Sequence, residues 1–401
     1  MYTKDIPAFG PLQGVRVVHA TQSIAGPYTA TRMADFGADV IWIENPKGMD
    51  VMRPGRWCAE LERRNMRSIC LDTPSEEGRK IFLNLIKTAD IFIDSYRGGQ
   101  MRKWGITDEV MQEANPRLII CHVSGYGQDG DPAFWPKPSF DPIAQAFSCY
   151  MSLNGFPERP PIPAVPYPGD YYTAMFTAYA AMAALYRRTI TGKGEVIDSA
   201  QFEVLLSVQG PQLGTYLNTG VLPKREGNHS PANAGYGAYV CKDGKAIYTL
   251  CAGVGVVRNA MKLFGLEFDD DIPAGSAGIP LDGPGGAKFE AAMQKYCDER
   301  TAAEVEEGFA AAGLPCNRIF DYSDVVDHPH YKARNVFIEW QNTHGDTIKG
   351  PNVFPKLKEN PGKVWRGLMD IGEDTHDILT ELGYSEEEIA KFQAEGVAVK
   401  K

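Results

Sequence analysis

The alternation of short apolar segments with helix-like segments between Val15 and Val123 constrains the fold more than any other feature of the chain. The apolar segments, such as VRVVHA, ADVIWIE and PRLIICHV, are nearly continuous runs of the kind found in strands covered on both faces. Segments such as AGPYTATRMADFG and SEEGRKIFLNLIKTA separate them. This order predicts an α/β fold with a doubly wound, Rossmann-like parallel sheet. Such sheets bind ligands beyond the carboxyl ends of their strands, which points to the loops at 21–27, 44–67 and 95–99.

The length of the chain predicts two domains. Its 401 residues exceed the ~250 to 300 residues at which a single core stops growing. A polar, glycine-rich stretch at 218–235 is typical of a linker, and the hairpin-like YGAYVCKDGKAIYTLC and several helical segments follow it. We therefore expect a large domain built from 1–222 and 331–401, and a smaller α+β domain at 223–330.

Composition excludes several classes of function. A net charge of -10 argues against broad nucleic-acid binding, which requires neutralisation of phosphates. No run reaches the ~18 apolar residues needed to cross a bilayer, and the N-terminus lacks a signal-peptide core, so we expect a cytoplasmic protein without membrane contacts. The eight cysteines form no CxxC pair and the seven histidines no HExxH motif, which predicts reduced thiols and no metal site. TQSIAGPYT lacks the glycines of a dinucleotide-binding loop.

One carboxylate stands out in PAVPYPGDYYTA, at residues 163–174. Prolines and Gly169 hold Asp170 at the start of a helix expected at 170–188. Asp170 could simply cap this helix by accepting hydrogen bonds from the next turn. Alternatively, the helix N-terminus favours its ionised form and keeps it available as a nucleophile. The two interpretations are compatible.

Basic residues gather in LERRNMRS and YRGGQMRKWG, next to predicted strand ends. They could form a solvated face. They could equally bind the phosphates of a nucleotide, because Arg forks match phosphate geometry. The residues are Arg63, Arg64, Arg67, Arg97, Arg102 and Lys103.

Seven segments in the same order resemble the class III CoA-transferases, a group that includes the α-methylacyl-CoA racemases. They are FGPLQGVRVVHATQSIAGPYTATRMADFGADVIWIE, RRNMRSICLD, NPRLIICHVSGYGQDG, FDPIAQAFS, GDYYTA, TGKGEVID and DTHDILTELGYSEEEI. The resemblance spans essentially the whole chain. It is strongest to bacterial L-carnitine CoA-transferases, through IAGP, VIWIEN, ERRN, GITDEV, IAQAFS and KGPNVFPKLKENPGKVWRG.

The resemblance implies a mechanism and a set of site residues. Asp170 would form an acyl-aspartyl anhydride and then an aspartyl-CoA thioester, with a CoA thioester as substrate and no permanently bound cofactor. Oxyanion donors would be backbone amides near Gly235 and Gly237 or at the helix start. Arg97 would bind CoA phosphates, with Arg102 or Lys103 replacing the arginine that the carnitine enzyme has at the position of Trp104. We also assign Arg64, Arg67, Ile24 and Ala25 to CoA binding.

Several alternatives remain open on the sequence. Racemases carry a histidine where this chain has Phe140, which cannot shuttle a proton. A carnitine-like acid (L-carnitine, γ-butyrobetaine or crotonobetaine) is the first expectation for the substrate, and a 2-hydroxy acid, an arylacrylate or a bile acid is the alternative. A non-catalytic CoA-binding protein is the contrasting class. The resemblance also implies an interlocked homodimer. The rings that could hold a quaternary ammonium are Trp57, Trp135, Tyr150, Tyr171 and Tyr172.

Overall fold

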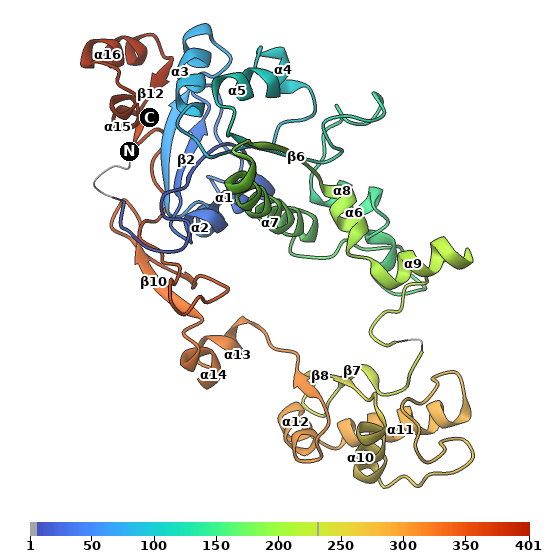
Figure 1. Cartoon of the computed structure of the whole chain (residues 1–401). Helices are drawn as coiled ribbons and strands as arrows, with labels where there is room; N and C mark the ends of the chain where they lie inside the picture. Colours follow the sequence, from blue (N-terminus) through green and yellow to red (C-terminus); the bar gives the residue numbers. More distant parts are fainter. Residues whose placement is uncertain (1–5, 231) are drawn as a thin grey trace. The chain divides into compact units, whose positions relative to one another are not determined.

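The computed structural model describes residues 6–230 and 232–401, which divide into two compact units (Figure 1). The first unit contains the described residues up to Met151, Pro163–Thr219 and Ala333–Lys401, and the second contains Ser152–Ile162 and Gly220–Lys332. Residues 152–162 thus cluster with the second unit and not with the larger domain expected for them. The reason is local, since the Arg225 guanidinium donates to backbone carbonyls of Phe156, Pro157 and Arg159.

A seven-stranded sheet forms the centre of the first unit, in the order β12-β3-β2-β1-β4-β5-β6. All neighbouring strands pair in parallel except β12, which pairs antiparallel with β3. The predicted α/β fold with a parallel-dominated sheet is confirmed. The strands are β1 Arg16–Ala20, β2 Asp39–Glu44, β3 Met66–Leu71, β4 Ile91–Asp94, β5 Ile119–Ser124, β6 Glu195–Ala200 and β12 Ala398–Val399.

Successive residues of the strands enter two different cores, one on each face of the sheet. Val18 of β1 packs in a cluster with α3, α5, α15 and α16, whereas its neighbour Val17 packs in a cluster with α1 and α7. The near-continuous apolar runs of the sequence follow from this double coverage. The helices are α1 Ala25–Ala34, α2 Arg56–Glu62, α3 Glu76–Ile86, α4 Gln100–Lys103, α5 Asp108–Ala114, α6 Asp141–Phe147, α7 Pro168–Thr191, α8 Gln201–Ser207, α9 Gly210–Thr219, α15 Thr375–Glu381 and α16 Glu386–Ala394.

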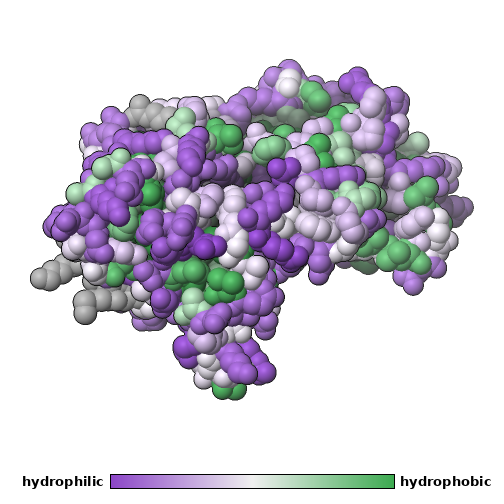
Figure 2. Space-filling view, turned by 90° about the horizontal axis from the view of Figure 1, so that it is seen from above, coloured by the Kyte–Doolittle hydropathy of each residue, from purple (hydrophilic) through white to green (hydrophobic). Residues whose placement is uncertain are grey.

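The first unit also contains the antiparallel pair β10 Phe337–Gln341 and β11 Thr347–Pro351. None of the helices in the described part of the chain is long and apolar enough to cross a membrane. On the face drawn in Figure 2, hydrophobic residues form separate patches among hydrophilic ones.

The second unit is a small antiparallel sheet with helices. Strands β7 Tyr236–Val240, β8 Ala246–Leu250 and β9 Cys316–Arg318 pair in sequence order. The hairpin predicted for YGAYVCKDGKAIYTLC is present, and its turn contains Gly244 at φ +75. Its core gathers Tyr239, Phe289 and Phe309. The helices of this part are α10 Val254–Phe264, α11 Pro284–Asp298, α12 Ala302–Ala311, α13 Tyr322–Val326 and α14 Pro329–Ala333, preceded by the 3-10 turn Met151–Leu153.

Candidate active site

A cavity of about 510 Å³ opens in the first unit beyond the carboxyl ends of β1, β2, β4, β5 and β6. All three loops expected from the sequence contribute to it, as does the start of α7. This is the place where doubly wound sheets bind their ligands. Its lining includes Gln22, Ser23, Ala25, Asn45, Val51, Tyr96, Arg97, Trp104, Ser124, Phe140, Asp170 and Gln201.

The start of α7 is held by a carboxylate from another helix. Asp141, the first residue of α6, accepts hydrogen bonds through Oδ1 from the amides of Gly169 (2.6 Å) and Asp170 (3.4 Å). Its Oδ2 accepts one from Gln145 Nε2 at 2.6 Å. Gln145 in turn bonds both backbone groups of Ala164, at 2.9 and 3.0 Å. Asp141 and Gln145 therefore clamp the proline-rich lead-in to the helix start.

Gly169 is required by this clamp. A Cβ atom at this position would lie 2.8 Å from Asp141 Oδ1 and 3.1 Å from a methyl carbon of Leu205. Any side chain would push the Asp141 carboxylate away from the amides that it caps. The glycine next to Asp170 in the sequence thus serves the approach of Asp141.

The capping interpretation of Asp170 is wrong. The side chain of Asp170 accepts no hydrogen bond from the amides of α7, because those of Gly169 and Asp170 donate to Asp141 and that of Tyr171 donates to the carbonyl of Tyr167. Its hydrogen bond comes from Gln201 Nε2, which donates to Oδ1 at 2.5 Å. Among the described residues, none donates a hydrogen bond to Oδ2. Asp170 is only 7% exposed and lines the cavity, so one of its oxygens is held and the other is left for a ligand.

The electrostatics of Asp170 differ from the expectation that the helix N-terminus favours its ionised form. Burial, and after it the nearby Asp141 carboxylate, raise the pKa of Asp170 from an ordinary value of 3.8 to about 7, although the hydrogen bond from Gln201 opposes the rise. Burial also raises the pKa of Asp141. The helix-start amides cannot reverse this, because they already point at Asp141. Asp170 is thus a largely buried carboxylate that is more basic than usual, on the wall of the cavity.

The residues assigned to CoA binding fall into two groups. Arg97 is exposed, lines the cavity, and its guanidinium has no partner within residues 6–230 and 232–401. Arg102 and Lys103 are exposed on α4, next to Trp104, which lines the cavity and packs edge-on against Tyr96 at 5.0 Å. Ala25 at the start of α1 also lines the cavity, whereas its neighbour Ile24 is buried and does not.

Arg64 and Arg67 lie outside the cavity, contrary to their assignment to CoA binding. Arg64 makes a two-pronged ion pair with Asp35 at 2.9 and 2.8 Å, and Arg67 makes one with Asp39 at 3.0 and 2.8 Å. Arg67 also pairs with Glu381 at 2.7 Å. Both side chains are almost fully buried. Their charges are neutralised inside the fold, so neither guanidinium is free for a phosphate.

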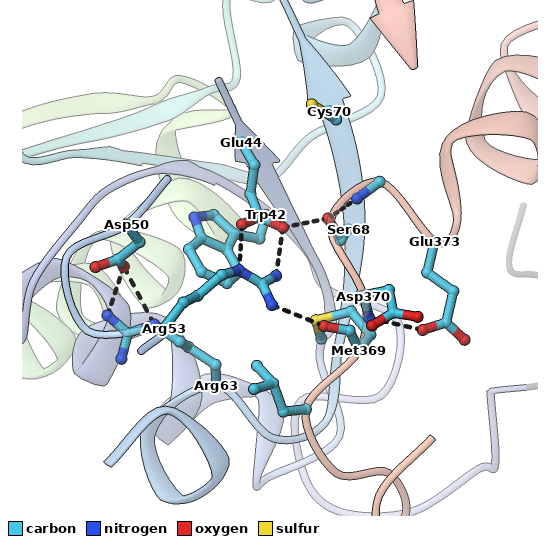
Figure 3. Close-up of polar contacts among 12 residues, drawn as sticks. Trp42, Glu44, Asp50, Arg53, Arg63, Ser68, Cys70, Met369, Asp370 and Glu373 are labelled. Carbon is cyan, nitrogen blue, oxygen red and sulfur yellow. Dashed lines mark hydrogen bonds and ion pairs between the residues drawn. The ribbon is translucent and has the colours of Figure 1, made fainter. Parts of the chain in front are cut away.

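A second buried network supports the loop after β2 (Figure 3). The Arg53 guanidinium makes a bidentate ion pair with both oxygens of Glu44, at 2.7 and 2.6 Å, and donates to the carbonyl of Met369 at 2.9 Å. The Arg63 guanidinium pairs with Asp50 at 2.6 Å and donates to the carbonyl of Ser23, a lining residue. Arg63 is therefore a structural support of the cavity wall and not a ligand group.

The two glycines proposed as oxyanion donors belong to the second unit. The amide of Gly235 donates to Glu290 Oε1 at 2.6 Å, so this donor is already satisfied. Gly237 lies within β7, opposite Thr249 of β8, and a Cβ there would meet His229 at 2.3 Å. Their packing explains both glycines without an oxyanion role.

The aromatic residues considered for a quaternary ammonium do not gather at the cavity. None of the five belongs to its lining. The hydroxyl of Tyr171 donates to Glu62 at 2.5 Å, and the ring packs against Tyr28 at 4.8 Å. The ring of Trp135 covers the Gly98–Gly99 turn, where a Cβ on Gly98 would meet it at 2.5 Å.

Sequence reasoning missed Asp141 as the clamp and Gln201 as the partner of Asp170. Gln201 follows directly after β6, so the rule that directs attention to strand ends would have found it. Asp141 gave a weaker signal. It belongs to the FDPIA segment, but nothing in that segment shows which amides its carboxylate meets.

The chain is similar to known proteins over most of its length. Residues 12–375 match the family described as CoA-transferase family III. A CAIB/BAIF family protein from Brucella suis is 28% identical, covering 94% of this chain and 100% of that one, with a TM-score of 0.78. The protein Rv3272 from M. tuberculosis shares the fold at 24% identity, covering 93% and 99% of the two chains, with a TM-score of 0.80.

Proposed function

Because the chain belongs to CoA-transferase family III, we propose that it moves CoA between an acyl-CoA and a free carboxylic acid, with Asp170 as the nucleophile. The observation that carries this proposal is the state of the Asp170 carboxylate: buried, bonded through Oδ1 to Gln201, and without a hydrogen-bond donor from the described residues at Oδ2. A buried carboxylate that neither caps its helix nor pairs with a cation lowers stability, and such carboxylates cluster at functional sites.

The proposed reaction has four displacements. Asp170 attacks the acyl carbon of the acyl-CoA, an Asp–O–acyl bond forms, the C–S bond breaks, and CoA leaves as thiolate. The thiolate then attacks the aspartyl carbon and releases the first acid as a carboxylate, which leaves an aspartyl-CoA thioester. The acceptor carboxylate attacks this thioester and releases the thiolate. The thiolate finally attacks the acceptor's acyl carbon, and Asp170 leaves as carboxylate.

The site suits this chemistry in two respects. A pKa of about 7 makes Asp170 a stronger nucleophile than an ordinary carboxylate, and it remains largely ionised in mildly alkaline solution. The low exposure of Asp170 limits the access of water to the anhydride and thioester, which water would otherwise hydrolyse. Arg97 on the cavity wall, with Arg102 and Lys103 nearby in sequence, would bind the phosphates of CoA.

A carnitine-like acid remains our first proposal for the substrate, on the resemblance of the sequence. The positions of the aromatic side chains add no support to it, so a bulky 2-hydroxy acid, arylacrylate or bile acid is the alternative. A racemase is less well supported, because Phe140 lines the cavity and offers no proton.

We also propose a homodimer. One side of α7 leaves large apolar residues in water: Tyr179 is 76% exposed, Tyr186 73% and Ile190 67%. Their spacing places them along one stripe of the helix, and a second copy of the chain would cover it.

The test is a search for a covalent adduct. The protein is incubated with acetyl-CoA, butyryl-CoA or crotonobetainyl-CoA, treated with hydroxylamine or borohydride, digested and analysed by mass spectrometry. We expect modification confined to the peptide that contains Asp170, absent in Asp170→Asn. Asp198→Asn is the matched control, because Asp198 is also a carboxylate with a pKa raised by burial, but it does not line the cavity.

The other outcomes separate the alternatives. A label that persists in Asp170→Asn would contradict the assignment of the nucleophile. No adduct with any acyl-CoA would favour a non-catalytic CoA-binding protein. Exchange of α-deuterium without transfer of CoA would favour a racemase.

A further inference from the structure

The reaction proposed above requires a donor at one particular oxygen. In the second and third displacements the attacked atom is the aspartyl carbon, so the negative charge of each tetrahedral intermediate develops on an oxygen of Asp170 itself. The oxygen that bridges Asp170 and the acyl group leaves with the first acid in the second displacement. An oxygen of the acceptor carboxylate replaces it in the third. The other oxygen remains on the aspartyl carbon throughout and becomes the oxyanion twice.

Only one side chain within residues 6–230 and 232–401 donates to the Asp170 carboxyl group. The Nε2 of Gln201 lies 2.5 Å from Oδ1. Three other amides considered for the oxyanion are occupied, since those of Gly169 and Asp170 donate to Asp141 and that of Gly235 donates to Glu290. The fourth, that of Gly237, lies within β7 of the second unit. Oδ2, which has no such donor, is then the oxygen that forms the bond to the acyl group.

We propose that Gln201 is a catalytic residue that stabilises the oxyanion formed on Oδ1 of Asp170 during formation and breakdown of the aspartyl-CoA thioester. This inference rests on the proposed function. Gln201 is 5% exposed, lines the cavity, and begins α8 directly after β6. Its side chain has no other hydrogen-bond partner in the described part of the chain. Its one hydrogen bond therefore aims the donor at the reacting group from the cavity wall.

A neutral amide suits this position better than a cation. Carboxylate, anhydride, thioester and tetrahedral intermediate all present an acceptor at Oδ1, so one N–H group serves every state without a proton transfer. An Arg or Lys at this distance would strongly favour the ionised ground state of Asp170 and weaken it as a nucleophile. The hydrogen bond from Gln201 strengthens as charge accumulates on Oδ1, which is the condition for catalysis.

The proposal predicts which steps depend on Gln201. In the first and last displacements the oxyanion develops on the acyl oxygen of the substrate, away from Gln201. Loss of the Gln201 donor should therefore slow the appearance of the CoA adduct by about 100-fold or more. Formation of the acyl adduct should change by less than about 3-fold, so the acyl adduct should accumulate.

The experiment is a rapid acid quench followed by intact-protein mass spectrometry, on the full chain. The donor is whichever of acetyl-CoA, butyryl-CoA and crotonobetainyl-CoA labels the unaltered protein fastest. Gln201→Met keeps the length of the side chain and removes the N–H. Gln201→Glu keeps the shape of the side chain and places an ionised acceptor there at alkaline pH. We therefore expect it to form the CoA adduct at least as slowly as Gln201→Met does. Gln209→Met is the matched control, because Gln209 is a buried glutamine just beyond the end of α8 whose side chain bonds only backbone carbonyls.

The results separate the two proposals. Accumulation of the acyl adduct in Gln201→Met, with both adducts at normal rates in Gln209→Met, supports the role of Gln201. Normal formation of the CoA adduct in either variant at position 201, or an equal slowing of both adducts, overturns it while Asp170 remains the nucleophile. Absence of any label on the unaltered protein overturns the proposed function and the role of Gln201 with it.

Discussion

Replacing Asp170 with Asn should stabilise the protein, and the gain should grow with pH. The folded state raises the pKa of this carboxyl to about 7 from 3.8, so folding disfavours its ionised form. Well below its ordinary pKa of 3.8 the group is protonated in both folded and unfolded chains and contributes no penalty. As the pH rises toward 7, the unfolded chain releases the proton first, and the folded state loses stability.

The size of the effect follows from the two pKa values. A pKa difference of one unit corresponds to about 1.4 kcal/mol. Ionisation of Asp170 therefore lowers the free energy of unfolding by about 2 kcal/mol at pH 5 and about 4 kcal/mol at pH 8.5. An Asn carries no charge and has no such penalty. The stability of Asp170→Asn relative to the unaltered protein should therefore rise by about 2 to 3 kcal/mol between these pH values.

Urea unfolding followed by tryptophan fluorescence measures this difference in the relevant unit. All 6 tryptophans belong to the first unit, which also holds Asp170. Asp35→Asn is an informative control, because Asp35 is buried but paired with Arg64, and its loss should destabilise the protein at both pH values. A stability difference for Asp170→Asn that stays within about 1 kcal/mol across the range would refute the argument that burial holds this carboxyl near neutrality.

Three further predictions concern the surroundings of Asp170. Asp141→Asn keeps an acceptor for the helix-start amides but removes a negative charge next to Asp170, so the pH at half-maximal labelling of Asp170 should fall by roughly one unit. An unchanged midpoint would rule out repulsion between the two carboxylates. Arg97→Ala should raise the KM for acyl-CoA by about 10-fold with little change in kcat, because an exposed cation contributes binding and not chemistry; an unchanged KM would contradict its contact with CoA. Arg64→Met should lower the free energy of unfolding by about 2 to 3 kcal/mol, because Asp35 loses one of its two arginine partners and keeps Arg32 at 2.8 Å; a raised KM without loss of stability would instead support a CoA contact.

Local pattern predicted the elements of the first unit because each depends on its own residues. The apolar runs at β1, β2 and β5 can only be strands buried on both faces, and that requirement places helices on both sides of the sheet. The rule for strand ends then predicted the loops that line the cavity. Asp170 was singled out by its own neighbours in the chain.

The partners of charged groups could not be predicted in the same way. Arg64 and Arg97 look alike in sequence, both lying near strand ends among other basic residues. The fold buries Arg64 against Asp35, 29 residues away, and leaves Arg97 on the cavity wall. Burial and the nearest opposite charge decide between an ion pair and a binding group, and both depend on packing of distant segments.

The sequence by itself determined the parallel sheet, the loops around the cavity and the carboxylate at the start of α7. Only the tertiary structure decided that Asp141 would cap that helix, that Gln201 would hold one oxygen of Asp170, and that burial would bring its pKa close to neutrality. Strands and helices form from the spacing of residues along the chain. The ionisation and hydrogen bonding of a side chain depend instead on groups 29 and 31 residues away that folding brings within 3.5 Å or less.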